Sequence, residues 1–302
     1  MKYIIKLMSL LLVITSFASC EEEEVLVSDF NGRDPFPIIE QGTTEASQLA
    51  YGFLEEHELH MYYDLEGEEA LQTEYGAMGK PSKFVDGVLP ADEERAVIFL
   101  NLIDEMFDLF SDYRELHFAR RWILVGNGFS SSTAEKLDTY GYNRDILYYN
   151  TQGTQMISNV NNDFEFNLSL TKEMLLFAYF YAYVDHSYNI PEDFSSISGD
   201  IYRRYTFSSI PFHTSATEYD EEGATDAGFV HPWGLTAISL KPHEDWESYI
   251  VWIISRPKAE RDVWLTTKPN IKAKYDIVVE SMMTDLNMDL EALSIQWQSV
   301  GI

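Results

Sequence analysis

The segment MLLFAYFYAYV, residues 174–184, contains no polar side-chain group other than its tyrosine hydroxyls. It is too short for a membrane-spanning helix, which needs about 20 predominantly apolar residues. Titratable side chains bracket it, with Lys172 and Glu173 before it and Asp185 and His186 after it. The pattern predicts a helix buried in a globular domain, and the remaining elements are expected to pack around it.

The region before this helix combines strand and helix patterns. Runs rich in aromatic and aliphatic residues predict strands at 58–63, 122–125 and 146–149. Asp92 can cap a helix whose apolar positions recur at spacings of three and four residues. These positions are Val97, Leu100, Ile103, Phe107 and Phe110. The Asn-rich stretch 150–167 is expected to form a loop.

The region after the segment is expected to be mostly helical. Pro242 and Asp245 introduce an amphipathic helix that ends before Pro257. Two further helices are predicted at 271–283 and 289–300, the second of them capped by Asp289 at its first position. The sequence therefore predicts an α+β protein with a mixed sheet, one buried helix and a mostly helical C-terminal half.

Three successive parts are expected along the chain. Residues 1–19 form a signal peptide, residues 20–37 form a tether, and residues 38–302 form a single folded domain or one subdivided near 165–170. The tether ends in a stretch rich in turn-forming residues, which separates it from the domain.

The N-terminal segment is typical of a bacterial lipoprotein. Two lysines precede an apolar stretch, 7–14, and two small residues precede Cys20, the single cysteine of the chain. Phe17 stands where lipoprotein signals usually carry leucine, so a plain signal peptide cleaved nearby is the alternative. We expect lipidation at Cys20 and attachment to a membrane through the N-terminal lipid, because a free thiol is unfavourable in an oxidising compartment. One cysteine excludes an intramolecular disulfide framework and a thiolate zinc cluster.

The chain is strongly acidic. It carries 50 Asp and Glu against 21 Lys and Arg, a formal net charge of −29, and loss of residues 1–19 removes only two lysines and gives −31. A polyanion repels phosphate backbones, which argues against a nucleic-acid partner. Glu21–Glu24 directly follow the cysteine and resemble the acidic export tag of surface lipoproteins in the Bacteroidota, although a solvated tether is a sufficient explanation. We expect a lipid-anchored protein of the outer membrane, exposed at the cell surface.

Metallopeptidase chemistry requires two imidazoles one helical turn apart with a neighbouring carboxylate, usually as His-Glu-x-x-His. The chain contains neither this motif nor its inverted form. The nearest string, His57–His60, has the wrong spacing, and its histidines are expected at the surface. His231, His243, Glu244 and Glu247 are weak candidates for an irregular metal site, against the simpler interpretation of a polar helix start.

Six short segments occur in an order and spacing that are typical of one family. They are Arg121–Gly126, Ile190–Phe194, Gly228–Val230, Glu244–Glu247, Lys274–Tyr275 and Leu286–Leu290. Through them the chain resembles the zinc-binding metallopeptidase lipoproteins of the Bacteroidota, also called substrate-import-associated zinc metallohydrolase lipoproteins. The resemblance covers most of residues 50–298 and implies a zincin-like scaffold.

The resemblance fails where the family carries its metal ligands. Counting back from Pro191 by the family's spacing places the motif at 178–182, so Ala178 and Ala182 replace the two histidines and Tyr179 replaces the general base. Alanine offers no donor atom to a metal. We therefore expect no cofactor and no catalytic residue: the 174–184 helix is a former active-site helix in a pseudoenzyme.

The resemblance also implies partners. Family members are similar to accessory lipoproteins that accompany a TonB-dependent outer-membrane transporter and its lid lipoprotein of the starch-utilisation type. The first hypothesis is a non-catalytic subunit of such a complex, which binds its partners or holds peptide or glycan. The alternatives are an active zinc hydrolase with an irregular site formed by His231, His243 and Glu247, and a structural subunit of another outer-membrane barrel complex that assembles or secretes proteins.

Overall fold

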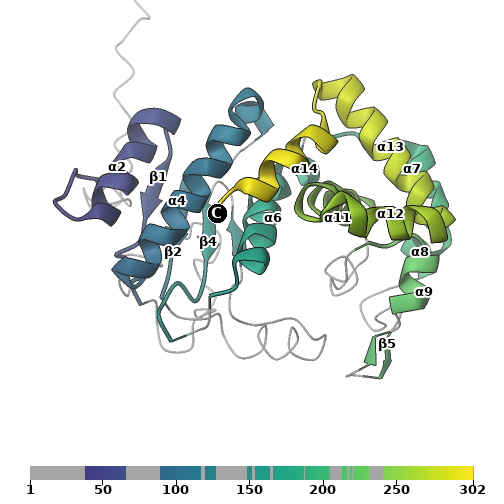
Figure 1. The fold of residues 1–302 in the computed structure, drawn as a ribbon, viewed down its shortest axis with the longest axis horizontal. Helices are drawn as coiled ribbons and strands as arrows, with labels where there is room; N and C mark the ends of the chain where they lie inside the picture. Colours follow the sequence, from purple (N-terminus) through teal and green to yellow (C-terminus); the bar gives the residue numbers. More distant parts are fainter. Residues whose placement is uncertain are drawn as a thin grey trace, which may run out of the picture. The chain divides into compact units, whose positions relative to one another are not determined.

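The computed structural model describes residues 38–65, 89–116, 120–126, 148–151, 154–163, 166–186, 188–204, 213–215, 218–219, 221–230 and 241–301 (Figure 1). The chain divides into Met1–Pro37 and a compact unit, Ile38–Ile302. All described residues belong to the second unit, so Cys20 and the acidic tether lie outside the described residues.

A four-stranded mixed sheet occupies the N-terminal part of the unit. Its strands are β1 (His60–Tyr62), β2 (Arg121–Leu124), β3 (Tyr148–Thr151) and β4 (Thr154–Ile157). They lie in the order β1-β2-β4-β3, with β1, β2 and β4 parallel and β3 antiparallel to β4. Trp122 and Leu124 alternate with Ile123 along β2, so they face the main core while Ile123 faces the opposite side.

Strand β4, which pairs in parallel with β2, was not predicted, because the stretch 150–167 was expected to form a loop. Thr154 and Gln155 are polar but fully buried, since β4 lies between β2 and β3. The run is four residues long and only its last two are apolar. Its strand conformation therefore depends on pairing with distant strands, which local sequence does not show.

Two helices pack beside the sheet. α2 (Glu45–His57) begins at a reciprocal cap, in which Ser47 N–H donates to the Thr44 hydroxyl and Thr44 N–H to the Ser47 hydroxyl. α4 (Glu93–Leu109) begins at Asp92 as predicted, but the Asp92 carboxylate accepts from Asn162 N–H at 2.7 Å rather than from its own helix. The predicted face of α4 is confirmed: Leu100, Ile103, Phe107 and Phe110 are buried, and Val97 packs against them at the edge. A short 3₁₀ helix, η1 (Ser111–Leu116), follows α4.

The predicted buried helix is α6 (Leu168–His186), which packs against β3, η1 and α11. Every side chain from residue 171 to residue 180 is buried. Aromatic rings supply most of its packing, because Tyr179 lies against both Phe107 and Phe110. No helix in the described part of the chain has the length and apolar character needed to cross a membrane.

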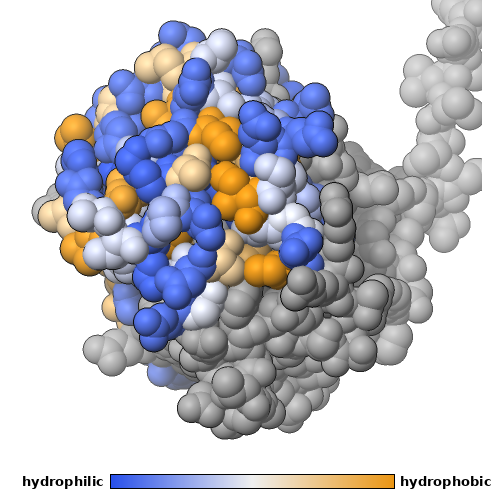
Figure 2. All heavy atoms as spheres, turned by 90° about the vertical axis from the view of Figure 1, so that its right-hand side faces the viewer, coloured by the Kyte–Doolittle hydropathy of each residue, from blue (hydrophilic) through white to orange (hydrophobic). Residues whose placement is uncertain are grey.

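The C-terminal half is helical, as predicted. Its helices are α7 (Glu192–Ile197), α8 (Gly199–Arg204), α9 (Glu221–Asp226), α11 (Pro242–Ser255), α12 (Lys258–Thr267), α13 (Pro269–Leu286) and α14 (Leu290–Ser299), with a small hairpin of β5 (His213–Ser215) and β6 (Glu218–Tyr219). α11 packs against α6 and α14, and α13 packs against α7, α9 and α12. Figure 2 shows the side on which α7, α12 and α13 lie, where hydrophobic residues are interspersed among hydrophilic ones. Val263 and Met283 are exposed hydrophobic residues of α12 and α13.

Candidate functional site

The described side chains of the window in which the resemblance places metal ligands lie inside the core. Ala178 and Tyr179 on α6 are each 0% exposed. The Tyr179 ring lies 4.9 Å from the Phe110 ring and 5.4 Å from the Phe107 ring, and its hydroxyl donates to the Tyr113 carbonyl at 3.4 Å. The side chain of Ala182, one turn further along α6, lies outside the described residues.

The backbone of the window is also engaged with the sheet. Gln155 of β4 donates its side-chain amide to the Ala178 carbonyl at 2.6 Å, in a buried environment. Among the described residues, the Gln155 side-chain oxygen and the Thr154 hydroxyl are buried without a hydrogen-bond partner. Zinc requires three or four N, O or S donors at about 2.0–2.3 Å. A methyl group at 178 and a ring-packed phenol at 179 do not provide them, so these residues do not fit a zinc ion.

The irregular candidates on α11 are not gathered into a metal site. His243 and Glu244 lie in the first turn of α11, and Glu244 accepts from the Lys241 backbone N–H at 3.3 Å, as the polar helix start predicts. Glu247 is buried one turn further on. His231 lies outside the described residues. In the described part of the chain, none of the three α11 side chains belongs to a group of three or more metal-capable side chains within 4.8 Å.

A buried ionic cluster joins α8, α11 and α13. Lys274 of α13 donates to the Asp245 carboxylate of α11 at 2.5 Å, to the Gly228 carbonyl at 3.0 Å and to the Tyr202 hydroxyl of α8 at 3.1 Å. Tyr202 also hydrogen-bonds Asp245, and Tyr249 donates to the Gly228 carbonyl at 3.0 Å. The Lys274 side chain is 0% exposed and the Asp245 side chain 2%. We call these five residues the Lys274 cluster.

Aromatic rings enclose the ammonium group of Lys274. The nearest ring centroid, that of Phe229, lies 4.4 Å from Nζ, and the rings of Phe194, Tyr202 and Tyr249 lie at 5.0, 5.3 and 5.9 Å. Burial lowers the pKa of Lys274 and raises the pKa of Asp245, while their mutual attraction opposes both shifts. No solvent-exposed atom of the Lys274 side chain remains, so the cluster can hold helices together but cannot reach a substrate.

The backbone conformation at residue 228 explains why glycine occupies this position. Its φ is +89°, and a Cβ would lie 3.2 Å from the Asn270 side chain. This left-handed conformation is unfavourable for other residues. It places the Gly228 carbonyl where both Lys274 and Tyr249 donate to it.

The Lys274 cluster was not predicted as a unit. Four of the six segments that carry the family resemblance nevertheless meet in it or at its rings, through Phe194, Gly228, Asp245 and Lys274. Residues of the cluster therefore lie in the segments that carry the resemblance, but the spacing of these segments along the sequence did not show that they meet in the folded chain. At these four residues the segments contribute contacts between helices.

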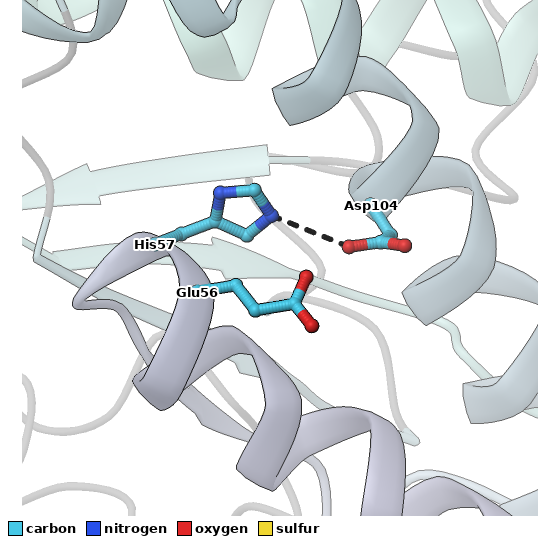
Figure 3. A group of neighbouring side chains, drawn as sticks. All are labelled: Glu56, His57 and Asp104. Carbon is cyan, nitrogen blue, oxygen red and sulfur yellow. Dashed lines mark hydrogen bonds and ion pairs between the residues drawn. The ribbon is translucent and has the colours of Figure 1, made fainter.

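A third group lies between α2 and α4. The His57 Nε2 atom lies 3.3 Å from the Asp104 carboxylate, and Glu56 places its carboxylate beside them (Figure 3). Ligand atoms of the three residues all lie within 4.8 Å of one another. The expectation of surface histidines is wrong for His57, which is 7% exposed because its ring packs between Phe53 and Phe107. His60 lies on β1, so the two histidines of the string do not form a pair.

Comparison with known proteins gives a structural match. No protein-family model and no curated protein matches the sequence. The fold is similar to that of a solved structure described as a putative zinc-binding metallo-peptidase from Bacteroides caccae, with a TM-score of 0.60 and 16% sequence identity over 89% of this chain and 95% of that one. Similarity at this identity establishes the fold, and the expected α+β metallopeptidase-like scaffold is confirmed.

Proposed function

We propose that the protein is a non-catalytic relative of the metallopeptidases, which works by binding rather than by hydrolysis. The packing of Ala178 and Tyr179 carries this proposal. Both side chains are 0% exposed within a scaffold that resembles a zinc-binding metallo-peptidase. An active site needs metal donors and water at this position, whereas α6 presents a methyl group and a phenol packed on phenyl rings.

We further propose that the protein is an accessory subunit of an outer-membrane TonB-dependent transporter and its lid lipoprotein. Cys20 provides the lipid anchor, and the acidic tether holds the folded unit away from the lipid at the cell surface. The arrangement keeps a binding domain beside the transporter, where it contacts its partners or holds peptide or glycan for import.

Peptide hydrolysis by the purified protein tests the absence of catalysis. We expect no turnover of a mixed peptide library with or without added Zn²⁺, and no difference between the protein and His243→Ala. Zinc-dependent cleavage that His243→Ala abolishes would overturn the proposal in favour of an irregular hydrolase site at His243.

Purification from outer membranes after in-cell cross-linking tests the assembly. We expect the protein to incorporate labelled palmitate, Cys20→Ala to abolish the labelling, and the wild type to cross-link to a large barrel transporter and a second lipoprotein. Cross-links to a barrel-assembly or secretion factor instead would place the protein in another outer-membrane machine and contradict the transporter assignment.

A further inference from the structure

The group formed by Glu56, His57 and Asp104 lies at the junction of two helices. His57 is the last residue of α2, and Glu58 ends that helix in the left-handed conformation. Asp104 lies on α4, which packs against α2. Figure 3 shows the Glu56 carboxylate extending from α2 toward the gap between the His57 ring and Asp104. Three side chains capable of binding a metal therefore converge from two elements that are far apart in sequence.

The imidazole of His57 is held in place by its packing. Its ring centroid lies 5.6 Å from that of Phe53 and 5.4 Å from that of Phe107, and its side chain is only 3% exposed. This packing fixes the ring with Nε2 toward Asp104, whose side chain is 40% exposed. A rigid imidazole beside accessible carboxylates leaves an ion able to approach from solvent and retain water ligands.

The distances suit a small divalent ion. Two ligands at about 2.0–2.1 Å from a tetrahedral zinc ion lie about 3.3–3.4 Å apart. The His57 Nε2 and Asp104 carboxylate oxygen are 3.3 Å apart. A carboxylate oxygen of Glu56 lies within 4.8 Å of the other two ligand atoms, and Glu56 is exposed, so its side chain has room to turn toward an ion.

The local charge also favours a cation. Two carboxylates face the gap, and the C-terminal end of α2 adds the partial negative charge of the helix dipole. An imidazole among the ligands favours transition metals over Mg²⁺ and Ca²⁺, which prefer oxygen ligands alone.

We propose that Glu56, His57 and Asp104 bind a divalent transition-metal ion of the Zn²⁺ class, which links the end of α2 to α4. The site is distinct from the 178–182 window on α6 and does not depend on the proposed function. Because His57 and Glu56 belong to α2 and Asp104 to α4, bound metal stabilises the contact between these helices.

Zinc titration of the metal-stripped full chain by calorimetry, in an excess of Mg²⁺ to suppress binding to scattered acids, tests the site. We expect one Zn²⁺ per chain and a rise in Tm on binding. Glu56→Gln and Asp104→Asn preserve shape and should each weaken binding by at least about tenfold. Glu55→Gln and Asp108→Asn remove the same charge from neighbouring exposed positions of α2 and α4 and should change affinity by less than about twofold.

Absence of stoichiometric binding would overturn the proposal, as would equal weakening by the control variants or full binding by both site variants. Circular dichroism of all four variants verifies that each is folded. Cobalt substitution gives an independent readout, because the absorption spectrum of bound Co²⁺ reports its coordination, and the Asp104→Asn protein should need a higher Co²⁺ concentration than the wild type to develop that spectrum. Peptide cleavage by the zinc-loaded wild type that Asp104→Asn abolishes would refute the non-catalytic function while leaving the metal site intact.

Discussion

Ala178 and Tyr179 of the window on α6 and the Lys274–Asp245 pair are both buried, but they fill the interior by opposite means. Around Ala178 and Tyr179 the side chains pack on rings and aliphatic groups, and the hydrogen bonds from Gln155 and the Tyr179 hydroxyl join neutral groups. Around Lys274 an ion pair is buried inside four aromatic rings, with a backbone carbonyl as a further acceptor. The first arrangement contains no charge that needs a partner, whereas the second is stable only if every partner is present.

This contrast explains how a metallopeptidase-like fold can form in a chain that lacks the His-Glu-x-x-His motif. The segments that resemble the family lie mainly where helices are joined, and four of them meet at the Lys274 cluster or its rings. A metal-binding motif contributes ligands, not contacts between helices, so under the proposed function apolar packing on α6 takes its place. Likeness in the joining segments therefore predicts the fold and not the chemistry.

Restoring the family motif on α6 should have the largest effect on stability. The triple variant Ala178→His, Tyr179→Glu, Ala182→His introduces polar groups where the described side chains are fully buried. We expect a loss of about 5 kcal/mol or more in the free energy of unfolding, because a carboxylate would replace a phenol packed between phenyl rings. Urea denaturation measures the loss.

Ser169→Glu is the matched control, since it adds a carboxylate at an exposed position of α6 and should change stability by less than about 0.5 kcal/mol. A triple variant that stays folded and binds zinc tightly would show that the site is vestigial and still open, and would contradict the packing argument.

Removing one partner of the buried pair should have the next largest effect. Among the described residues, Lys274→Met leaves the Asp245 carboxylate, 2% exposed, with a hydrogen bond from the Tyr202 hydroxyl. We expect a loss of about 3–5 kcal/mol. The double variant Lys274→Met, Asp245→Asn removes the unpaired charge and should recover about 2 kcal/mol of that loss.

Lys272→Met supplies the control on the same helix. Its ammonium pairs with Asp276 at the surface, where both side chains are about half exposed. Such pairs contribute about 0–1 kcal/mol. If both lysine variants lose stability equally, the Lys274 cluster is not the structural centre that the geometry indicates.

Local sequence was sufficient for the long helices. The buried helix α6, the start of α4 after Asp92 and the cap at Asp289 were predicted because apolar spacing and capping residues act within one or two turns, although the Asp92 side chain makes no hydrogen bond to its own helix. β4 was missed because its polar residues Thr154 and Gln155 are held by pairing with the distant strand β2, and Gln155 also donates to the Ala178 carbonyl of α6. α2 and α12 were also not identified from their patterns.

The clusters could not be predicted, because they join residues far apart in the chain. Lys274 and Asp245 are 29 residues apart, and His57 and Asp104 are 47 apart. The sequence contains 50 acidic residues, so abundance hides the few that matter. Burial distinguishes Asp245, whereas Asp104 is 40% exposed and is distinguished by its place beside the buried His57 ring. Both are properties of the folded chain.

An ion pair of intermediate exposure sharpens the comparison. The buried guanidinium of Arg261 donates two hydrogen bonds to the Glu291 carboxylate, one of them from Nη2 to Oε2 at 2.9 Å. The Glu291 side chain is 29% exposed. Hydrogen bonds from Arg261 lower the pKa of Glu291. We expect Glu291→Gln to cost about 1–2 kcal/mol at neutral pH, after allowance for solvent screening.

This contribution should depend on pH in a defined direction. A lowered pKa means that the ionised Glu291 stabilises the folded protein above the carboxyl's unfolded pKa of about 4.3 and loses that effect as the pH falls through the folded value. The difference in unfolding free energy between wild type and Glu291→Gln should therefore shrink in acid. A difference that stays constant from neutral to acidic pH would contradict the role of the charge.

The cap of α14 should have the smallest effect, although it lies in a segment that resembles the family. Asp289 accepts from the backbone N–H groups of Glu291 and Ala292 at 3.1 and 3.0 Å. Asp289→Ala should cost about 1 kcal/mol, whereas Asp289→Asn retains an acceptor and should cost less. Glu280→Ala, at an exposed position of α13, removes the same charge without a cap. Thermal denaturation of the three variants separates loss of the cap from loss of charge. A cost for Asp289→Ala as large as that of Lys274→Met would mean that α14 docks onto α11 only when its first turn is fixed, so the joining contacts would then extend from the Lys274 cluster to the end of the chain.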